Sequence, residues 1–493
     1  MSETVISFNP GDLIPFLPEL VLVGGLLILL IVDLIIHRNK GNTIAAAGGI
    51  LLVVLTIIAL TGNEKIGAYL FNAVVQDGVT LFFRVFFAIS ALIAIGIMVS
   101  SFKKEGEPFI LVLSSVLGMF LLAGSNDLVT LFVAIEMVSI PSYVLAGYKR
   151  KDPRSGEAAL KYVIFGAFSS GLLLYGFSLL YGLTGNTGLP EMAAELTKLS
   201  SGSPAQIVGL ILVLAGIGYK IAMVPMHFWC PDVYEGSPTP ITAFFSVLPK
   251  AAGFAALFRL MPLFATLKPA YGLSGVGLIT MVSALTMTFG NLGAIWQDSV
   301  KRLLAYSSIA HAGYILMGFA VIVSMPEGEL YNLAVTAVLF YLVVYMFMNL
   351  GAFLVVDWVE RHLGGDSIGY FKGLGKGNPL PALALAVFLF SLTGLPPLAG
   401  FIGKFYLFAA VVKAKMWALA MIGIANAVVS LFYYVRIIRD MYLHDPSPEF
   451  DNSEAPLKLG KLTAVLTLVT VVPTVILGIW WGPLAEWIKL RIF

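Results

Sequence analysis

The chain has few charged residues. Asp, Glu, Lys and Arg make up 12% of its 493 residues, whereas soluble globular proteins average about 25%. Hydrophobic residues account for 59%, and apolar segments of about 20 residues, enough to cross a bilayer as a helix, recur along nearly the whole sequence. The alternating segments of about 10 residues that mark a transmembrane barrel are absent. The composition therefore predicts an all-α polytopic membrane protein.

Several motifs that would indicate chemistry within the chain are also missing. The one cysteine, Cys230, excludes an intrachain disulfide and a multi-cysteine iron–sulfur site. It falls in a predicted loop without the His or Cys partners that a metal site requires. There is no phosphate-binding loop, haem-attachment motif or clear dinucleotide fingerprint, so ATP-driven transport by this chain alone is not expected. No basic block indicates nucleic acid, and the N-terminus lacks the basic start of a cleaved signal peptide.

Fourteen segments are predicted to span the membrane. Their ranges are 13–36, 43–60, 80–100, 109–123, 128–148, 158–181, 206–226, 239–261, 273–296, 300–323, 330–356, 380–411, 416–442 and 462–481. Connections after odd-numbered spans carry 17 Lys and Arg residues, against 8 on the other side. Because cytoplasmic loops are enriched in Lys and Arg, we expect both termini to face away from the cytoplasm. The segment 228–240 is an exception, since this count places it inside although it has no positive charge.

Four ionisable residues lie inside predicted spans: Glu136, Lys220, Lys250 and Lys404. A charge at the bilayer centre costs roughly 2.5–3.5 kcal/mol on insertion scales, so such residues usually mark an ion or proton path. The structural alternatives are a protonated or hydrogen-bonded carboxyl at Glu136 and a Lys220 side chain that extends to the membrane interface. We favour the functional interpretation for all four, because the lysines lie beside helix-breaking residues or near the middle of a span.

The remaining polar residues in spans are less informative. His311, in the middle of the tenth span, fits a relay member and a hydrogen-bonded structural histidine equally well. Arg84, Lys161 and Asp33 lie close to predicted span ends, where interfacial anchoring is the default interpretation.

Prolines are predicted to interrupt the seventh and twelfth spans. The two segments read "LVLAGIGYKIAMVPMHFW" and "FSLTGLPPLAGFIGKFYLF", and each combines glycines, a central lysine and proline. Proline has no backbone N–H to donate within a helix. Paired interruptions in two halves of a chain are typical of transport sites. A shift of five spans maps the fifth onto the tenth and the seventh onto the twelfth, and because five is odd the two copies would be inverted.

These residues could act together. A carboxylate beside Lys220 would favour its charged form, and separation from Glu136 would let the lysine release a proton. Lys250 and then Lys404 could carry the proton onward through the hydroxyl groups of nearby residues. The candidates for those hydroxyls are Tyr306, Ser307 and Ser308.

Four stretches carry a resemblance to a known family. The segments "PDVYEGSPTPITAF", "EMVSIPSYVLAGY", "LLAYSSIAHAGY" and "LTGLPPLAGFIGKF" are similar to those of the NuoN-type, antiporter-like and Mrp-related subunits of respiratory complex I, the proton-translocating NADH:quinone oxidoreductase. The likeness extends over roughly residues 15–480. It implies 14 transmembrane helices with two inverted five-helix repeats and discontinuous helices 7 and 12. The implied divisions are 1–108, 109–262 and 263–445 for helices 1–3, 4–8 and 9–13, and 446–493 for helix 14.

The resemblance also implies roles. Glu136 and Lys220 match the coupling pair, Lys250 the linking lysine, Lys404 the position on helix 12, and His311 a possible relay. NADH, FMN, iron–sulfur clusters and quinone would be bound by other subunits, with no cofactor or metal in this chain.

The resemblance further implies partners and a location. The neighbours would be NuoM, NuoK and the lateral helix of NuoL, in the bacterial cytoplasmic membrane with both termini on the periplasmic side. Two alternatives stay open at this point. One is a subunit of a sodium/proton antiporter without a redox arm, and the other is a membrane spacer whose buried charges only fix helix packing.

Overall fold

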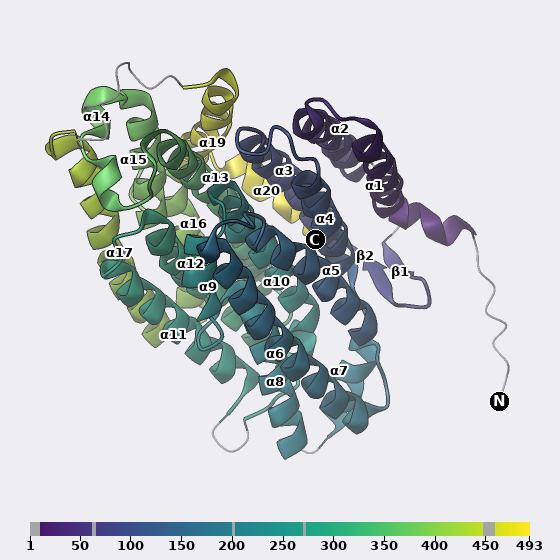
Figure 1. Ribbon diagram of the computed structural model, residues 1–493. Helices are drawn as coiled ribbons and strands as arrows, with labels where there is room; N and C mark the ends of the chain where they lie inside the picture. The colour runs from purple at the N-terminus through teal and green to yellow at the C-terminus, as the bar shows by residue number, and fades with distance from the viewer. Residues whose placement is uncertain (1–9, 62–65, 200–202, 270–272, 447–458) are drawn as a thin grey trace.

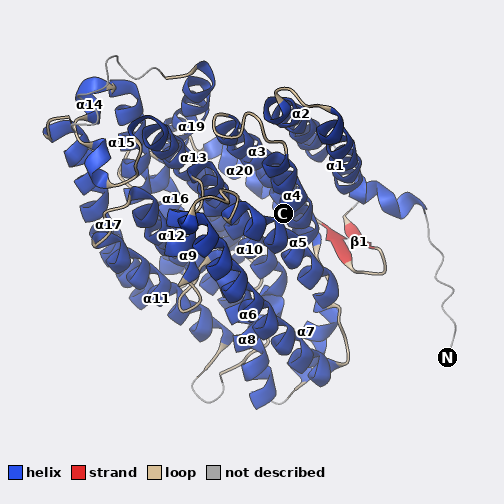
Figure 2. Cartoon of the chain, viewed as in Figure 1, coloured by secondary structure: helices blue, strands red, loops and turns tan. Residues whose placement is uncertain are grey.

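The computed structural model describes residues 10–61, 66–199, 203–269, 273–446 and 459–493. Within them, long helices lie side by side in one bundle, with α1 and α2 at one edge and α11 and α17 at the opposite edge (Figure 1). Nearly all the described chain is helical, apart from one small hairpin (Figure 2). The hairpin pairs β1 (Gly67–Tyr69) with β2 (Val74–Gln76) in antiparallel register.

Thirteen helices in the described residues are long and apolar enough to cross a membrane. They are α1 (Leu17–Ile35), α2 (Lys40–Thr61), α3 (Gly78–Val99), α4 (Glu107–Gly124), α5 (Leu128–Ala146), α6 (Pro153–Thr184), α8 (Pro204–Ile221), α10 (Thr239–Ala265), α11 (Gly275–Ile295), α12 (Val300–Ser324), α13 (Glu329–Leu363), α17 (Trp417–Leu443) and α19 (Lys461–Ile479). The short elements are η1 (Pro10–Phe16), α7 (Leu189–Lys198), α9 (Trp229–Gly236), η2 (Ile368–Phe371), α14 (Leu374–Gly377), α15 (Pro379–Thr393), α16 (Ala399–Lys413) and α20 (Gly482–Ile492). Each predicted span except the twelfth corresponds to one of the thirteen.

Small residues allow the helices to approach closely. Apolar side chains gain little by leaving lipid for protein, so membrane helices associate through tight backbone packing. A Cβ added at Gly290 of α11 would lie 2.5 Å from the backbone nitrogen of Ala310 in α12, and one at Gly313 of α12 would lie 2.5 Å from the backbone nitrogen of Met287. Helices α10, α12 and α13 are the most fully buried, and they form the centre of the bundle.

Two interruptions break the helical pattern where the prolines predict them. Helix α8 ends at Ile221, Ala222 adopts a left-handed conformation with φ of 57°, and α9 begins at Trp229. The twelfth predicted span, 380–411, consists of α15 and α16, separated by a turn in which Gly394 has φ of 92°. The interruption predicted within this span is therefore present, because Pro396 and Pro397 cannot continue the hydrogen-bond ladder.

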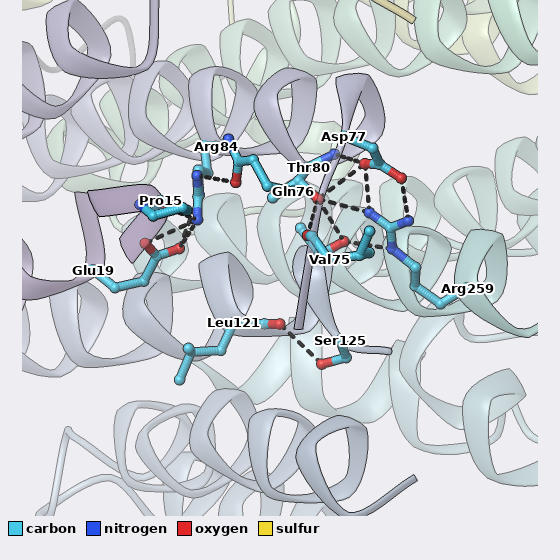
Figure 3. A network of polar contacts seen from close by, with 11 residues as sticks. Pro15, Glu19, Val75, Gln76, Asp77, Thr80, Arg84, Leu121, Ser125 and Arg259 are labelled. Carbon is cyan, nitrogen blue, oxygen red and sulfur yellow. Dashed lines mark hydrogen bonds and ion pairs between the residues drawn. The ribbon is translucent and has the colours of Figure 1, made fainter. Parts of the chain in front are cut away.

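Two arginines fasten the N-terminal part of the chain to the bundle, as Figure 3 shows. Arg84 on α3 is 1% exposed and pairs with Glu19 of α1 at 2.8 Å. Arg259 on α10 makes two hydrogen bonds of 2.6 and 2.8 Å to the carboxylate of Asp77, which caps α3. The prediction that Arg84 is an interfacial anchor is wrong, because a carboxylate from another helix holds it inside the protein.

The other two predicted anchors are also paired. Asp33 is 7% exposed and lies 2.8 Å from the ammonium of Lys40, so burial contradicts its assignment as an anchor. Lys161 is partly exposed and donates to Asp232 at 2.6 Å.

Candidate functional site

Lys220 lies at the end of α8, where the helix is interrupted, and its side chain points into the bundle. Its ammonium donates to the hydroxyl of Ser139 on α5 at 2.5 Å. That hydroxyl donates in turn to the carbonyl of Ile135 at 2.6 Å. The lysine is only 5% exposed, so it does not extend to the membrane interface.

Glu136 lies three residues before Ser139 on the same helix, but it faces a different partner. The hydroxyl of Ser170 on α6 donates to its carboxylate at 2.5 Å. Among the described residues, no ion pair within 4.0 Å joins Glu136 to Lys220. The direct pair expected from the sequence is not formed in this structure, and Lys220 donates to Ser139 instead.

Glu136 also lies near the outside of the chain. Its side chain is partly exposed, and its neighbours Val129, Val133 and Ile140 on α5 are at least half exposed. An ionisable group on an otherwise apolar transmembrane face requires a partner or water. This face of α5 is therefore suited to contact another membrane protein.

Lys250 links the two halves of the bundle. The residue is on α10, and its ammonium donates to the hydroxyl of Ser308 on α12 at 2.5 Å. The thiol of Cys230 lies 3.7 Å from the same ammonium. Cys230 is fully buried within α9, so its prediction as a loop residue is wrong. The sequence missed α9 because proline and glycine at its ends mimic a loop.

Lys220 and Lys250 are connected through the contact of α8 with α10. A Cβ added at Gly253, three residues after Lys250, would lie 3.0 Å from Cβ of Lys220. Residues three apart share one face of a helix, so both lysines lie along the same packed seam.

His311 is bonded on both sides of its ring. Nδ1 lies 2.6 Å from the hydroxyl of Tyr341 on α13, and Nε2 lies 3.3 Å from the hydroxyl of Tyr434 on α17. Tyr434 is also hydrogen-bonded to Ser307. The predicted hydroxyl carrier Tyr306 is not in this chain of contacts, because its ring packs beside Gly293 of α11. Tyr434, more than 120 residues away in sequence, takes that place.

Lys404 closes the broken end of α15. Its ammonium donates to the carbonyl oxygens of Leu392 and Thr393 at 3.0 and 2.8 Å. These carbonyls are among those that a terminating helix leaves without partners. The ammonium also lies 4.6 Å from the ring centroid of Tyr314, which is three residues after His311. Lys404 therefore adjoins the same face of α12 as the histidine.

One face of α13 belongs to the site and was missed in the sequence. Tyr341, Tyr345 and Asn349 recur every fourth residue, which places them on one side of the helix. Within the described chain, the Tyr345 hydroxyl and both polar atoms of the Asn349 side chain are buried without a hydrogen-bond partner. A cavity of about 10 Å³ lies beside Tyr345, Lys250 and Ser308, close to the space that one water molecule needs. The four-residue spacing of polar groups was the available signal.

A charged cluster surrounds α9 at one end of the site. Asp232 accepts from Lys161 and from Arg302, both at 2.6 Å, and Arg302 also reaches Glu235 at 2.8 Å. Burial alone would raise the pKa of Asp232, but its hydrogen bonds and charge interactions with the two cations outweigh burial and lower the pKa. The positive charges missing from segment 228–240 are thus supplied by other helices.

The described residues contain no group of three or more His, Cys, Asp or Glu side chains that could hold a metal ion. The site instead contains three of the four buried lysines in the described part of the chain, Lys220, Lys250 and Lys404, each no more than 5% exposed. Their partners are hydroxyl and carbonyl oxygens. Such a series can hold and pass protons between neutral oxygen atoms.

Comparisons with known proteins agree over nearly the whole chain. The sequence profile of the family described as "NADH:quinone oxidoreductase/Mrp antiporter, TM" matches residues 125–430. NADH-quinone oxidoreductase subunit N 2 of Sorangium cellulosum is 44% identical, over 97% of this chain and 97% of its own length. A chain in the structure of respiratory complex I from Thermus thermophilus with bound aureothin is 30% identical with a TM-score of 0.79, covering 95% of this chain and 99% of that one. A chain of the Mrp complex from Dietzia sp. is 22% identical with a TM-score of 0.81, over 98% and 97%, and shows the same fold.

Proposed function

Because this chain belongs to the NADH:quinone oxidoreductase/Mrp antiporter transmembrane family, we propose that it is a proton-translocating membrane subunit of an NADH:quinone oxidoreductase. Protons move along the buried seam that contains Glu136, Lys220, Lys250 and Lys404, with His311 as a relay. The driving energy comes from quinone reduction elsewhere in the complex. NADH, FMN, iron–sulfur clusters and quinone are bound by other subunits.

The observation that carries this proposal is that the three buried lysines of the site donate hydrogen bonds to neutral oxygen atoms and not to carboxylates. Lys220 and Lys250 donate to serine hydroxyls, and Lys404 donates to backbone carbonyls. Burial disfavours a charged ammonium, and a neutral oxygen offsets less of that cost than a carboxylate does. Lysines built only to fix helix packing would be expected in ion pairs, like those of Arg84 and Arg259 in the same chain. Neutral partners leave the ammonium free to give up its proton.

Glu136 is the group through which the rest of the complex acts on the seam. Its carboxylate is close to the outer face of α5, on the same helix as Ser139, the acceptor of Lys220. A change of charge at a partner on that face would shift Lys220 between Ser139 and Glu136. NuoK is one of the neighbours proposed for this chain. NuoM and the lateral helix of NuoL are further neighbours, in a bacterial cytoplasmic membrane with both termini of this chain periplasmic.

The finer architecture proposed is 14 crossings with two inverted five-helix repeats, 109–262 and 263–445, flanked by 1–108 and 446–493. The pair α15 and α16 then forms one interrupted crossing that corresponds to α8 with the turn after it. Both interruptions carry a buried lysine, Lys220 and Lys404, which supports the correspondence. Lys250 donates across the boundary between the two repeats to Ser308.

The test is to purify the native assembly from its membrane and to assay NADH-linked and ferredoxin-linked quinone reduction. We expect quinone reduction coupled to proton uptake into inverted vesicles. Copurification with small membrane antiporter subunits alone, and without redox activity, would show a sodium/proton antiporter component instead. Lys220→Ala and Glu136→Gln should assemble normally but pump fewer protons per NADH. An unchanged proton ratio in both variants would show that the buried charges only fix helix packing.

A further inference from the structure

An apolar groove lies on the outer side of the bundle, and Lys220, Lys250 and Lys404 are not among the residues that line it. It is bounded by α3, α13, α19 and α20, and its volume is about 470 Å³, within the range of about 300–1,000 Å³ for small-molecule sites. Phe82 and Phe86 form its floor, while Val472 and Ile476 at its mouth are 44% and 46% exposed. Three of the four helices are candidate membrane spans, so the groove opens toward the lipid.

One end of the groove has a positive charge. Leu60, at the end of α2, lines the groove, and its carbonyl accepts a hydrogen bond of 3.1 Å from the guanidinium of Arg491 on α20. The indole of Trp487 lines the same end, one helical turn before Arg491. A Cβ added at Gly78, the first residue of α3, would lie 2.0 Å from the carbonyl oxygen of Arg491. The basic group is therefore at the level where α2 ends and α3 begins.

From one end of the groove to the other, a basic group, an aromatic ring and then apolar side chains follow in the order that an anionic phospholipid would require. An aromatic residue and an arginine at a helix end are typical of the membrane interface, where headgroups lie. The apolar part continues along α3 from Phe82 to Ile89, about 10 Å at 1.5 Å per residue. We propose that the groove holds one acyl chain of an anionic phospholipid, with its phosphate at Arg491.

The groove adjoins the small cavity beside one buried lysine, Lys250. Phe86 lines the groove and also lines the cavity beside Lys250 and Ser308. An acyl chain in the groove supports the outer side of the Phe86 ring, which separates lipid from that cavity. The lining and charge of the groove do not depend on whether the lysines carry protons.

The test uses the purified complex that contains the full chain, reconstituted in nanodiscs with a phosphatidylglycerol probe whose acyl chain carries a photoactivatable diazirine. After irradiation, we expect adducts on the peptides that contain Phe82 to Ile89 and Trp487. Arg491→Gln should reduce these adducts by about fivefold, as expected from the loss of one basic residue at an anionic headgroup. Lys198→Gln, which removes an exposed basic residue on α7, should leave the adducts unchanged.

A second variant separates a lost site from a lost fold. Ile476→Trp places a large ring in the mouth of the groove at a position that is already 46% exposed. It should abolish labelling of these peptides while the complex keeps its native mass and NADH oxidation. The proposal is overturned if the wild-type peptides carry no adducts, if labelling is the same in Arg491→Gln, or if a cryo-EM map shows a helix of a neighbouring subunit in the groove.

Discussion

The ammonium of Lys220 donates to the hydroxyl of Ser139 rather than to the carboxylate of Glu136, although both acceptors are on α5 and only three residues apart. The buried base therefore has a neutral acceptor, although an acid lies on the same helix. Ser139 can accept from the lysine while it donates to the carbonyl of Ile135. In the proposed mechanism, Ser139 is the switch position from which Lys220 moves to pair with Glu136.

Replacement of this hydroxyl should change coupling more than stability. Ser139→Ala removes the acceptor of Lys220, and a hydrogen bond to a charged group is worth about 1.5–3 kcal/mol. We expect the lysine to turn toward Glu136 and the coupled NADH:quinone activity in membranes to fall roughly tenfold, since about 1.4 kcal/mol corresponds to a factor of ten. Coupled activity is measured in inverted vesicles by fluorescence quenching of a pH-sensitive dye.

Ser142→Ala is the matched control for this variant. Ser142 is on the same helix, is equally buried, and donates to the backbone carbonyl of Val138 rather than accepting from Lys220. It should pump at the wild-type rate. Equal losses in the two variants would mean that α5 merely tolerates substitution poorly, and the switch interpretation would fail.

Lys404 can be tested by separating its charge from its ability to lose a proton. Arginine keeps the positive charge and can still donate to the carbonyls of Leu392 and Thr393, but it does not deprotonate in proteins. Lys404→Arg should therefore assemble and keep the break between α15 and α16, while proton pumping falls about tenfold or more. The measurement is the proton-to-electron ratio of the purified complex in proteoliposomes. Normal pumping would show that Lys404 acts only as a cap for the broken helix.

The two hydroxyl partners of His311 decide between a relay and a structural histidine. Tyr341→Phe removes the group 2.6 Å from Nδ1 that fixes the tautomer of the ring. In a relay, pumping should fall severalfold with assembly unchanged, whereas in a structural role thermal stability should fall and the proton ratio should not. Tyr148→Phe is the control, because its hydroxyl donates to Glu107, which is not a partner of His311.

Sequence alone located the spans because the bilayer imposes a length and an apolar composition on each helix. It also located the four ionisable positions, because a charge in an apolar segment of 20 residues is visible without any tertiary information. The double proline indicated an interruption, but the helix ends at Thr393 and Ala399 follow from how Lys404 and Gly394 pack. Composition alone could not show at which residues the turn between α15 and α16 begins and ends.

The partners of the charged groups were not predictable from the sequence. Ser139 and Ser308 are ordinary residues in apolar helices, and only the packing of α5 on α8 and of α10 on α12 makes them acceptors. Arg84 failed as a predicted anchor for the same reason. Proximity to the end of a span does not reveal that Glu19, 65 residues earlier, lies opposite on another helix.

The ion pair of Asp77 with Arg259, which attaches α3 to α10, should make the stability of the protein depend on pH. Burial alone would raise the pKa of Asp77, but the charge and hydrogen bonds of Arg259 and the bonds from Thr80 lower it. The attachment therefore stabilises the fold above the ordinary Asp pKa of about 3.9 and weakens as pH falls through the lower folded value. Asp77→Asn can still cap α3, so it should cost about 1.5–3 kcal/mol at pH 7 through the ion pair alone. Thermal unfolding in detergent should show this difference shrinking below about pH 4. Asp445→Asn, which removes an exposed carboxylate, should leave the melting temperature unchanged, and a pH-independent difference at Asp77 would contradict the account.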